Sequence, residues 1–448
     1  MIDMANKLWD KGYDEDARID AFTVGHDREL DLELAPYDIL GTIAHITMLE
    51  SVGLLPKEDL DVLLPELKSL YSSALEGNFV IEPDVEDIHS QVELMLTRKL
   101  GDVGKKVHTG RSRNDQVLVD LNLFARARME KTVGKVSSLF KALQEASEKY
   151  KDVLIPGYTH LQVAMPSSFG LWFGAYAESL CDDLTILKAA WDVVNRNPLG
   201  SAAGYGSSAP LDRTLTTGLL GFDDLDYNSV YAQMTRGKME RAVAFAYSSV
   251  AETIGKLAYD GCLYSSQNFG FLRLPDALTT GSSIMPHKKN PDVFELVRAK
   301  CNKIQGVPNS IRLITGNLPS GYFRDMQILK EVFFPLFDEM DSCLDIVEYA
   351  IRGMEVSTEV MSDPKYKLAF SVEEVNRLVA QGVPFRDAYR QVAASIADGT
   401  FEFNGSLNHT HEGSIGNLCN DRIAAKMEKV LSGFGFEKVS DAVSALVK

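Results

Sequence analysis

Apolar residues recur every three or four positions along most of this chain, and few stretches alternate between apolar and polar as strands do. The longest patterns lie in the middle of the chain, where they predict helices over residues 115–150, 166–195, 228–265, 291–314 and 325–353. Shorter helices are predicted over residues 36–51, 57–76, 367–381, 384–398 and 420–433. We therefore expect an all-α fold built around a bundle of very long helices.

These helices also suggest how the chain is divided and assembled. A change in composition near residues 356–364 marks a boundary, so we expect three domains over residues 1–107, 108–355 and 356–448. Helices much longer than three or four turns carry more apolar surface than one chain can cover, which favours several chains packed side by side. Loops at opposite helix ends then meet only where neighbouring chains run antiparallel.

Four polar loops interrupt the helical pattern, over residues 101–116, 155–162, 197–213 and 281–291. The last of them contains a glycine, two serines, a histidine and two adjacent lysines, and it leads into a helix. Asn290 suits the N-cap of that helix and Pro291 its first position, while Asp292 and Glu295 favour its first turn. A mobile loop with paired cations at a helix start predicts an anion-binding site.

Composition narrows the range of functions. The 448 residues carry a formal net charge of −17 and no basic tail, which argues against a nucleic-acid partner. An anionic substrate must therefore be attracted by local cations. We find no transmembrane run and no signal-peptide pattern, so no membrane association is expected. The five cysteines are scattered and odd in number, which is typical of reduced thiols in a cytoplasmic protein.

The sequence lacks the familiar cofactor motifs. No spacing of His or Cys suits a metal ion, and no Walker loop, dinucleotide fingerprint or Gly-x-Ser-x-Gly elbow is found. We therefore expect no metal and no cofactor. The remaining loops carry cations, hydroxyls, amides and two histidines, which suit the binding of a polycarboxylate and the transfer of protons.

The loop at 281–291 has the groups that such chemistry needs. Removing a proton from a carbon next to a carboxylate builds a second negative charge on that carboxylate, and Lys288, Asn290 and helix-start N–H groups can stabilise it. A base must take the carbon proton, and an acid must protonate the leaving atom. A serine serves as base only where N–H groups and a lysine stabilise its alkoxide, and the Gly-Ser-Ser stretch beside Lys288 offers both.

Each of these features also has a purely structural interpretation. A serine pair in a loop is commonly polar filler, a single histidine such as His160 commonly makes a structural hydrogen bond, and adjacent lysines are commonly solvated. Arg111 and Arg113 could simply balance the acidic surface, and the acids at 82–87 could form a solvated helix start. Four such loops on one bundle weigh against these interpretations when they are taken together.

The loops resemble those of a known family. Residues 281–291 resemble the signature loop of the fumarase/aspartase superfamily, and residues 108–116 and 157–162 resemble its argininosuccinate lyase branch. Residues 197–201 and 322–330 fit as well, so the resemblance covers roughly the first three-quarters of the chain. It implies reversible cleavage of argininosuccinate to arginine and fumarate without a cofactor. It also implies a homotetramer with a twenty-helix core, whose active sites combine regions of three subunits.

The resemblance assigns roles to individual residues. Ser282 would be the base that takes the Cβ proton, and His160 would be its acid–base partner, with Glu295 raising the basicity of His160. Lys288 and Asn290 would hold the carboxylates on the fumarate side. The remaining substrate contacts implied by the resemblance are Thr23, Asp87, His89, Arg111, Ser112, Arg113, Asn114, Thr159, Tyr322, Gln327 and Lys330.

Two positions depart from the family pattern. Thr23 stands where the family often has a substrate-binding serine, but it keeps the hydroxyl. His287 stands where many argininosuccinate lyases have glutamine, and a histidine there is also familiar from adenylosuccinate lyases. Two alternatives therefore remain: a lyase of the same superfamily that acts on adenylosuccinate, and a catalytically inactive, crystallin-like relative.

Overall fold

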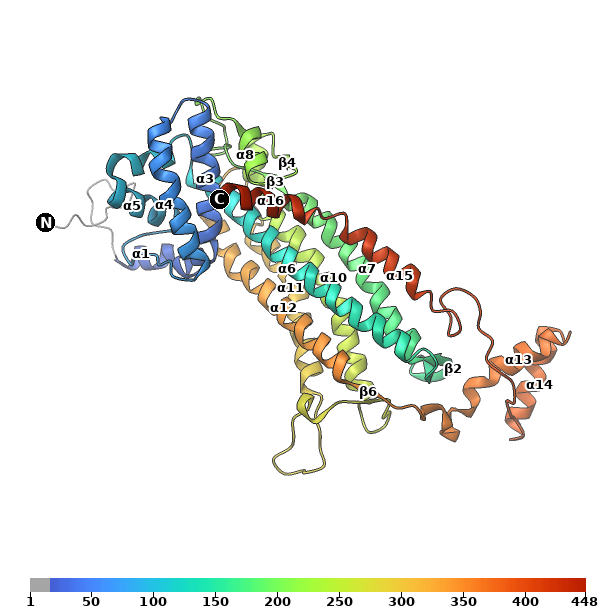
Figure 1. Cartoon of the computed structure of the whole chain (residues 1–448). Coiled ribbons are helices and arrows are strands. Elements are labelled where there is room, and N and C mark those ends of the chain that lie inside the picture. The colour runs from blue at the N-terminus through green and yellow to red at the C-terminus, as the bar shows by residue number, and fades with distance from the viewer. Residues whose placement is uncertain (1–16) are drawn as a thin grey trace.

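Five long helices form the centre of the protein in the computed structural model, which describes residues 17–448 (Figure 1). They are α6 (Arg113–Lys149), α7 (Phe169–Val194), α10 (Lys238–Tyr264), α11 (Asp292–Ile314) and α12 (Leu329–Gly353). α10 packs along α11 and α7, and α6 packs against α7 and α12. The prediction of a mostly helical fold with long central helices is confirmed.

Shorter helices surround this bundle. One end is covered by α1 (Ala17–Val24), α2 (Asp27–Asp31), α3 (Ala35–Ser51), α4 (Lys57–Leu75) and α5 (Ile88–Leu100). At the other end, α13 (Ser371–Ala380) and α14 (Phe385–Ala397) share a small apolar cluster of their own (Figure 1). α15 (Asn420–Leu431) then packs on α7, and α16 (Phe436–Val447) reaches α3 and α8 (Arg213–Leu219). The division into three domains stays a prediction.

Among residues 17–448, three two-stranded sheets depart from an all-α fold. β1 (Leu154–Thr159) pairs antiparallel with β2 (Gln162–Ser168), β3 (Arg196–Asn197) pairs parallel with β4 (Asp224–Leu225), and β5 (Leu272–Arg273) pairs antiparallel with β6 (Glu355–Val356). The first pair corrects the interpretation of 155–162 as a loop. The two tip residues, His160 and Leu161, have positive φ values of 54° and 56°, as a tight hairpin turn requires. Because β2 continues to Ser168, the following helix begins at Phe169 and not at 166.

The predicted helix over 228–265 is interrupted. α9 (Ser229–Met234) ends before α10 begins, and Gly237 lies between them with φ of 80°. A Cβ atom at that position would lie 2.5 Å from the side chain of Thr315, so the turn needs glycine. One correction concerns a helix end, because Pro291 and not Asn290 is the N-cap of α11. Another concerns a whole helix, because α16 was not predicted.

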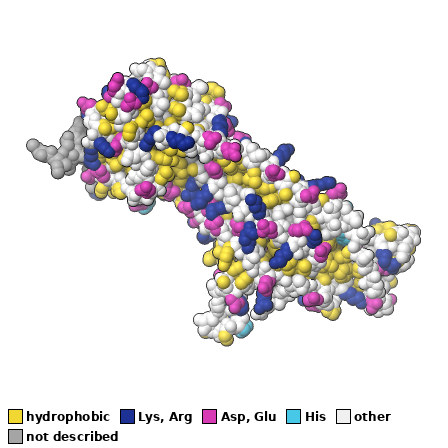
Figure 2. Space-filling model, in the orientation of Figure 1, with side chains coloured by type: hydrophobic (Ala, Val, Ile, Leu, Met, Phe, Trp, Pro, Cys, Tyr) yellow, Lys and Arg dark blue, Asp and Glu magenta, His cyan; other side chains and the backbone are white. Residues whose placement is uncertain are grey.

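Several helices of the bundle carry apolar side chains on their outer surface. Phe245 and Met234, which belong to the apolar stripe of the predicted helix over 228–265, are 63% and 49% exposed. Leu313 and Tyr349 are likewise exposed, and Figure 2 shows apolar side chains among the charged ones along the bundle. None of the described helices combines the length and the hydropathy that crossing a membrane requires.

The bundle interior contains a group of aromatic rings. Phe337 on α12 packs against Phe124 on α6 and Tyr247 on α10, with ring centroids 5.4 and 5.2 Å apart. Tyr247 donates a hydrogen bond to Thr132, and Thr132 donates one to Asp341, so both of these buried hydroxyl groups are paired. The three helices are thus joined by ring packing and by a buried hydrogen-bond chain.

Truncating Phe337 should destabilise the fold strongly. The side chain is fully buried, and replacing a buried Phe with Ala typically costs about 3–5 kcal/mol because a cavity remains. We expect Phe337→Ala to lower the free energy of unfolding by that amount in urea titrations at fixed protein concentration. Phe337→Leu is the control and should cost clearly less, since it leaves a smaller void. Equal losses for the two variants would contradict the packing argument.

Candidate functional site

A cavity of about 220 Å³ opens at the end of the bundle that α1 and α5 cover. It lies between the first turn of α6, the start of α5, and the segment from Tyr322 through the 3₁₀ turn η4 (Arg324–Ile328) into α12. Its lining consists mostly of charged and polar side chains: Asp27, Asp31, Glu86, Asp87, His89, Arg113, Asn114, Val117, Arg236, Tyr322, Arg324, Gln327 and Lys330. Seven of these belong to the substrate-binding set expected from the sequence, namely Asp87, His89, Arg113, Asn114, Tyr322, Gln327 and Lys330.

Two helix starts direct side chains into the cavity. Ser112 caps α6, and Asp115 completes the capping box, so Arg113 and Asn114 lie in the first turn facing the cavity. Asp87 caps α5, since its Oδ1 accepts a hydrogen bond of 2.8 Å from the N–H of Ser90. The acidic stretch before α5 is therefore a helix start, which agrees with the structural interpretation of the sequence. It is also part of the cavity wall.

Apart from the expected site residues of 159–160 and 281–295, which are described below, three residues expected in the site are not part of the cavity lining. Arg111 is half-buried and donates hydrogen bonds to Thr42 Oγ1 (2.9 Å) and the carbonyl of Val107 (2.8 Å). Ser112 is used as a cap. The hydroxyl of Thr23 donates to the carbonyl of Ile19 in its own helix. The main-chain oxygen of Thr23 accepts a hydrogen bond from Gln327, so Thr23 supports the cavity edge through its backbone.

His89 forms part of a buried ionic cluster below the cavity. Its Nδ1 lies 3.2 Å from Asp38 Oδ2 and 3.7 Å from Asp120 Oδ2. Burial alone lowers the pKa of His89, but Asp38, with Asp87 and Asp120, outweighs it and raises that pKa to about 9. His89 is therefore an imidazolium at neutral pH. Among the described residues, these three also have metal-ligand spacing, but Nδ1 of an imidazolium carries a proton and has no lone pair to offer.

A second ionic cluster forms the opposite wall, and two of its members were missed at the sequence level. Lys330 is almost fully buried and is paired with Asp27 and with Asp31, the latter at 2.5 Å. Burial raises the pKa of Asp27 to about 6, since the repulsion of Asp31 adds to it and Lys330 only partly offsets both. Two acids four positions apart share a helix face, so this spacing was the available signal for Asp27 and Asp31.

Three further charged residues of the lining were not predicted. Arg236 donates to Glu240 Oε1 (2.9 Å) and to the carbonyl of Met326 (2.8 Å), which ties the start of α10 to η4. Arg324 and Arg113 both pair with Glu86, at 3.0 and 3.1 Å. These pairs hold the rim formed by η4 against the start of α5.

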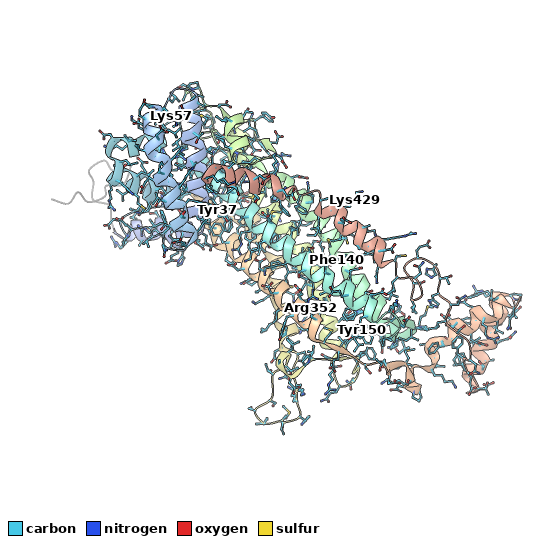
Figure 3. All side chains as sticks on the ribbon, viewed as in Figure 1. Tyr37, Lys57, Phe140, Tyr150, Arg352 and Lys429 are labelled. Carbon is cyan, nitrogen blue, oxygen red and sulfur yellow. The ribbon has the colours of Figure 1, made fainter. Side chains whose placement is uncertain are left out.

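His160 and Thr159 lie far from this cavity. Both are exposed at the tip of the β1–β2 hairpin, which follows the C-terminal end of α6. α6 has 37 residues, and at roughly 1.5 Å per residue it separates its first turn from the hairpin by about 55 Å. Figure 3 labels Tyr37 near the cavity end of the bundle and Tyr150, the residue after α6, near the hairpin end.

The segment 281–291 lies at a third place. α11 has 23 residues, so its start is roughly 35 Å from its end, where the chain turns toward Tyr322. The segment before α11 extends away from the bundle (Figure 1). Its base is closed by hydrogen bonds between the backbones of Thr280 and Asn290. Glu295 is exposed in the first turn of α11.

Ser282 has the local surroundings expected of an activated hydroxyl. Its Oγ accepts hydrogen bonds from the N–H groups of Met285 (3.2 Å) and Ile284 (3.4 Å). Hydrogen bonds to an oxygen favour its anionic form. Lys289 is paired with Asp276, whereas no ion pair of Lys288 is found among residues 17–448. Within one chain the predicted site residues therefore occupy three separate places.

Comparison with known proteins assigns this fold and these loops to a family. A family model described as lyase matches residues 13–306. An argininosuccinate lyase of Parabacteroides distasonis is 64% identical over 99% of this chain and all of that protein. One from Thermotoga neapolitana is 39% identical over 87% of this chain and 98% of that protein.

Solved structures show the same fold at low sequence identity. The crystal structure of EDDS lyase in complex with formate has a TM-score of 0.76 and 21% identity, and the match covers 97% of this chain and 95% of that one. A fumarate lyase:delta crystallin from Brucella melitensis, bound to cobalt, has a TM-score of 0.70 and 17% identity, with 91% of both chains covered. With the full-length relatives above, these matches mean that the chain belongs to the lyase family and, within it, to the argininosuccinate lyases.

Proposed function

We propose that this protein cleaves argininosuccinate reversibly to arginine and fumarate. Full-length relatives of that name support the reaction. The observation that carries the proposal here is the polar cavity, because it brings together seven of the residues expected to bind this substrate. The substrate carries both carboxylates and cationic nitrogen groups. The cavity suits it, because positively and negatively charged side chains both line the cavity.

The reaction is a β-elimination that needs no redox group. Ser282 takes the Cβ proton of the succinyl part, helped by the two N–H groups that bond to its Oγ. The developing charge passes to the adjacent carboxylate, which Lys288 and Asn290 stabilise. His160, with Glu295, takes part in acid–base transfer as the bond to the guanidino nitrogen breaks. All electrons in the broken C–N bond leave with that nitrogen, which gains a proton.

We further propose that the site is composite and that the protein is a homotetramer. Two observations support this: the site residues of one chain lie tens of ångströms apart by helix length, and apolar side chains on α10, α11 and α12 are exposed. Antiparallel packing of neighbouring bundles would bring a hairpin tip and a 281–291 segment to each cavity. Five bundle helices from each of four chains would make a twenty-helix core.

We also propose a cytoplasmic location, which the free cysteines suit.

A direct assay of two substrates tests this function. We expect purified protein to release fumarate from argininosuccinate, read by ultraviolet absorbance, and to release none from adenylosuccinate. His287 is the residue that makes adenylosuccinate the relevant alternative. Fumarate from adenylosuccinate alone would replace the proposed substrate. An intact but inactive protein on both substrates would favour a structural relative instead.

A further inference from the structure

The β1–β2 hairpin presents His160 at the end of the bundle opposite the cavity. All residues from Thr159 to Val163 are exposed at its tip, whereas Tyr158, directly before them, is half-buried. The position of His160 therefore depends on how Tyr158 and the strands behind it are held.

The pairing of the two strands is irregular just behind this tip. Between Pro156 and Tyr158 the register shifts, so that two residues of β2 lie opposite Gly157. A Cβ atom on Gly157 would lie 3.1 Å from the carbonyl oxygen of Met165, so glycine permits this close approach. A bulge bends its strand and changes the direction in which nearby side chains point. The bulge therefore sets the direction of the hairpin tip, and contacts outside the two strands maintain it.

Tyr158 makes such contacts through both its ring and its hydroxyl. The ring packs against Phe269 and Phe271, with centroids 5.7 and 6.4 Å apart. Burial, together with the hydrogen bond that its hydroxyl donates to Tyr366, raises the pKa of Tyr158. Tyr366 itself is only 4% exposed, and its ring centroid lies 6.2 Å from that of Phe271. Tyr158 is thus anchored in an aromatic cluster that lies outside the hairpin.

Tyr366 belongs to a distant part of the chain. It lies in the 3₁₀ turn η6 (Pro364–Phe370), which follows the bundle helices and packs against β2. In Figure 1, β6 and the chain that leads on to α13 lie at the hairpin end of the bundle. The C-terminal part of the chain therefore fastens the strand that leads to His160.

We propose that Tyr366 is a positioning residue for His160, which holds the hairpin tip through Tyr158. This inference rests on the function proposed above, in which His160 takes part in proton transfer. Ring packing tolerates small rotations, whereas a hydrogen bond is directional, so the hydroxyl of Tyr366 restricts the orientation of Tyr158. A displacement of a catalytic group by about 1 Å can slow a reaction roughly a hundredfold. Tyr366 can therefore affect turnover without touching the substrate.

Replacing Tyr366 with Phe keeps the ring and removes only the hydroxyl. We expect Tyr366→Phe to lower kcat on argininosuccinate roughly tenfold, because His160 would be held less firmly. KM should stay nearly constant, since the polar cavity is not altered. Tyr158→Phe should cause a similar loss, and the double variant should lose no more than either single variant. Steady-state kinetics on the full-length protein measure all three.

Tyr247→Phe is the matched control, because it removes another buried hydroxyl, which donates a hydrogen bond to Thr132 inside the bundle. It should keep the kcat and KM of the unaltered protein. Unchanged kcat in Tyr366→Phe would overturn the inference. So would losses that add up in the double variant, because the two hydroxyls would then act separately.

The proposed composite site allows a sharper comparison. In a mixture of His160→Asn and Ser282→Ala chains, every complete site takes its His160 from the Ser282→Ala chain. Tyr366→Phe added to that chain should lower the recovered activity roughly tenfold, whereas the same change in the His160→Asn chain should leave it unaltered. Equal losses in the two mixtures would contradict a role through His160. If no mixture recovers activity, the steady-state comparison decides alone.

Hydrogen exchange read by mass spectrometry tests the same contact without turnover. The amide groups of residues 155–163 should exchange faster in Tyr366→Phe than in the unaltered protein, while those of α5 should not change. Equal exchange across the hairpin in the two proteins would contradict the positioning role. If the hairpin responds as expected but the unaltered protein cleaves no argininosuccinate, the proposed function fails separately.

Discussion

Ser282→Ala should lower kcat on argininosuccinate roughly a thousandfold or more while substrate still binds. The hydroxyl is the proposed base, and loss of a positioned base typically costs about 10²–10⁴ in rate. Its Oγ accepts two backbone N–H groups at 3.2 and 3.4 Å, which favour the anionic form that a base needs. Substrate affinity should change little, because the cavity wall at the other end of the bundle is untouched.

Ser283→Ala is the matched control, because it removes a neighbouring hydroxyl from the same segment. We expect that variant to keep near-normal turnover. Steady-state kinetics on argininosuccinate and titration of the inactive variant with substrate separate binding from chemistry. Near-normal turnover by Ser282→Ala would remove Ser282 from the role of base, and equal losses in both variants would point to disturbance of the segment instead.

Mixing two inactive variants should restore activity. His160→Asn and Ser282→Ala chains each lack one group, and the two groups lie in separate places within a chain. If a site takes its His160 and its Ser282 from different chains, random assembly of equal amounts makes up to about a quarter of the sites complete. Fumarate release by unfolded, mixed and refolded protein would measure this recovery.

Two controls make this experiment decisive. The unaltered protein passed through the same unfolding and refolding gives the activity that full recovery would reach, and each variant refolded alone should stay inactive. Differently tagged chains verify that mixed assemblies have formed. If verified mixed assemblies show no activity, the composite site is wrong, and the separation of the loops within one chain needs another explanation.

The sequence correctly indicated the long helices, because an apolar stripe every three or four residues is a local property of the chain. It failed where the local pattern was ambiguous. The run from Ile155 to Gln162 contains Pro156 and Gly157 and does not alternate, so its strand pairing was not visible. Between 228 and 265 the apolar stripe continues across Gly237, although the chain turns there. Phe245 fits the stripe but faces outward, since periodicity does not say what covers a helix face.

The same distinction between local pattern and tertiary packing applies to the candidate site. The sequence by itself determined which residues are candidates for the chemistry, because the 281–291 segment, the 108–116 loop and His160 carry their residues in short local motifs. Only the tertiary structure decided which side chains share a cavity. Lys330 meets Asp31 from 299 residues away, and Asp27 joins them, while Thr23 turns its hydroxyl to its own helix. A sequence motif specifies only local spacing, whereas a buried ion pair depends on how distant helices pack. The charges on the cavity wall that contains these residues therefore follow from that packing.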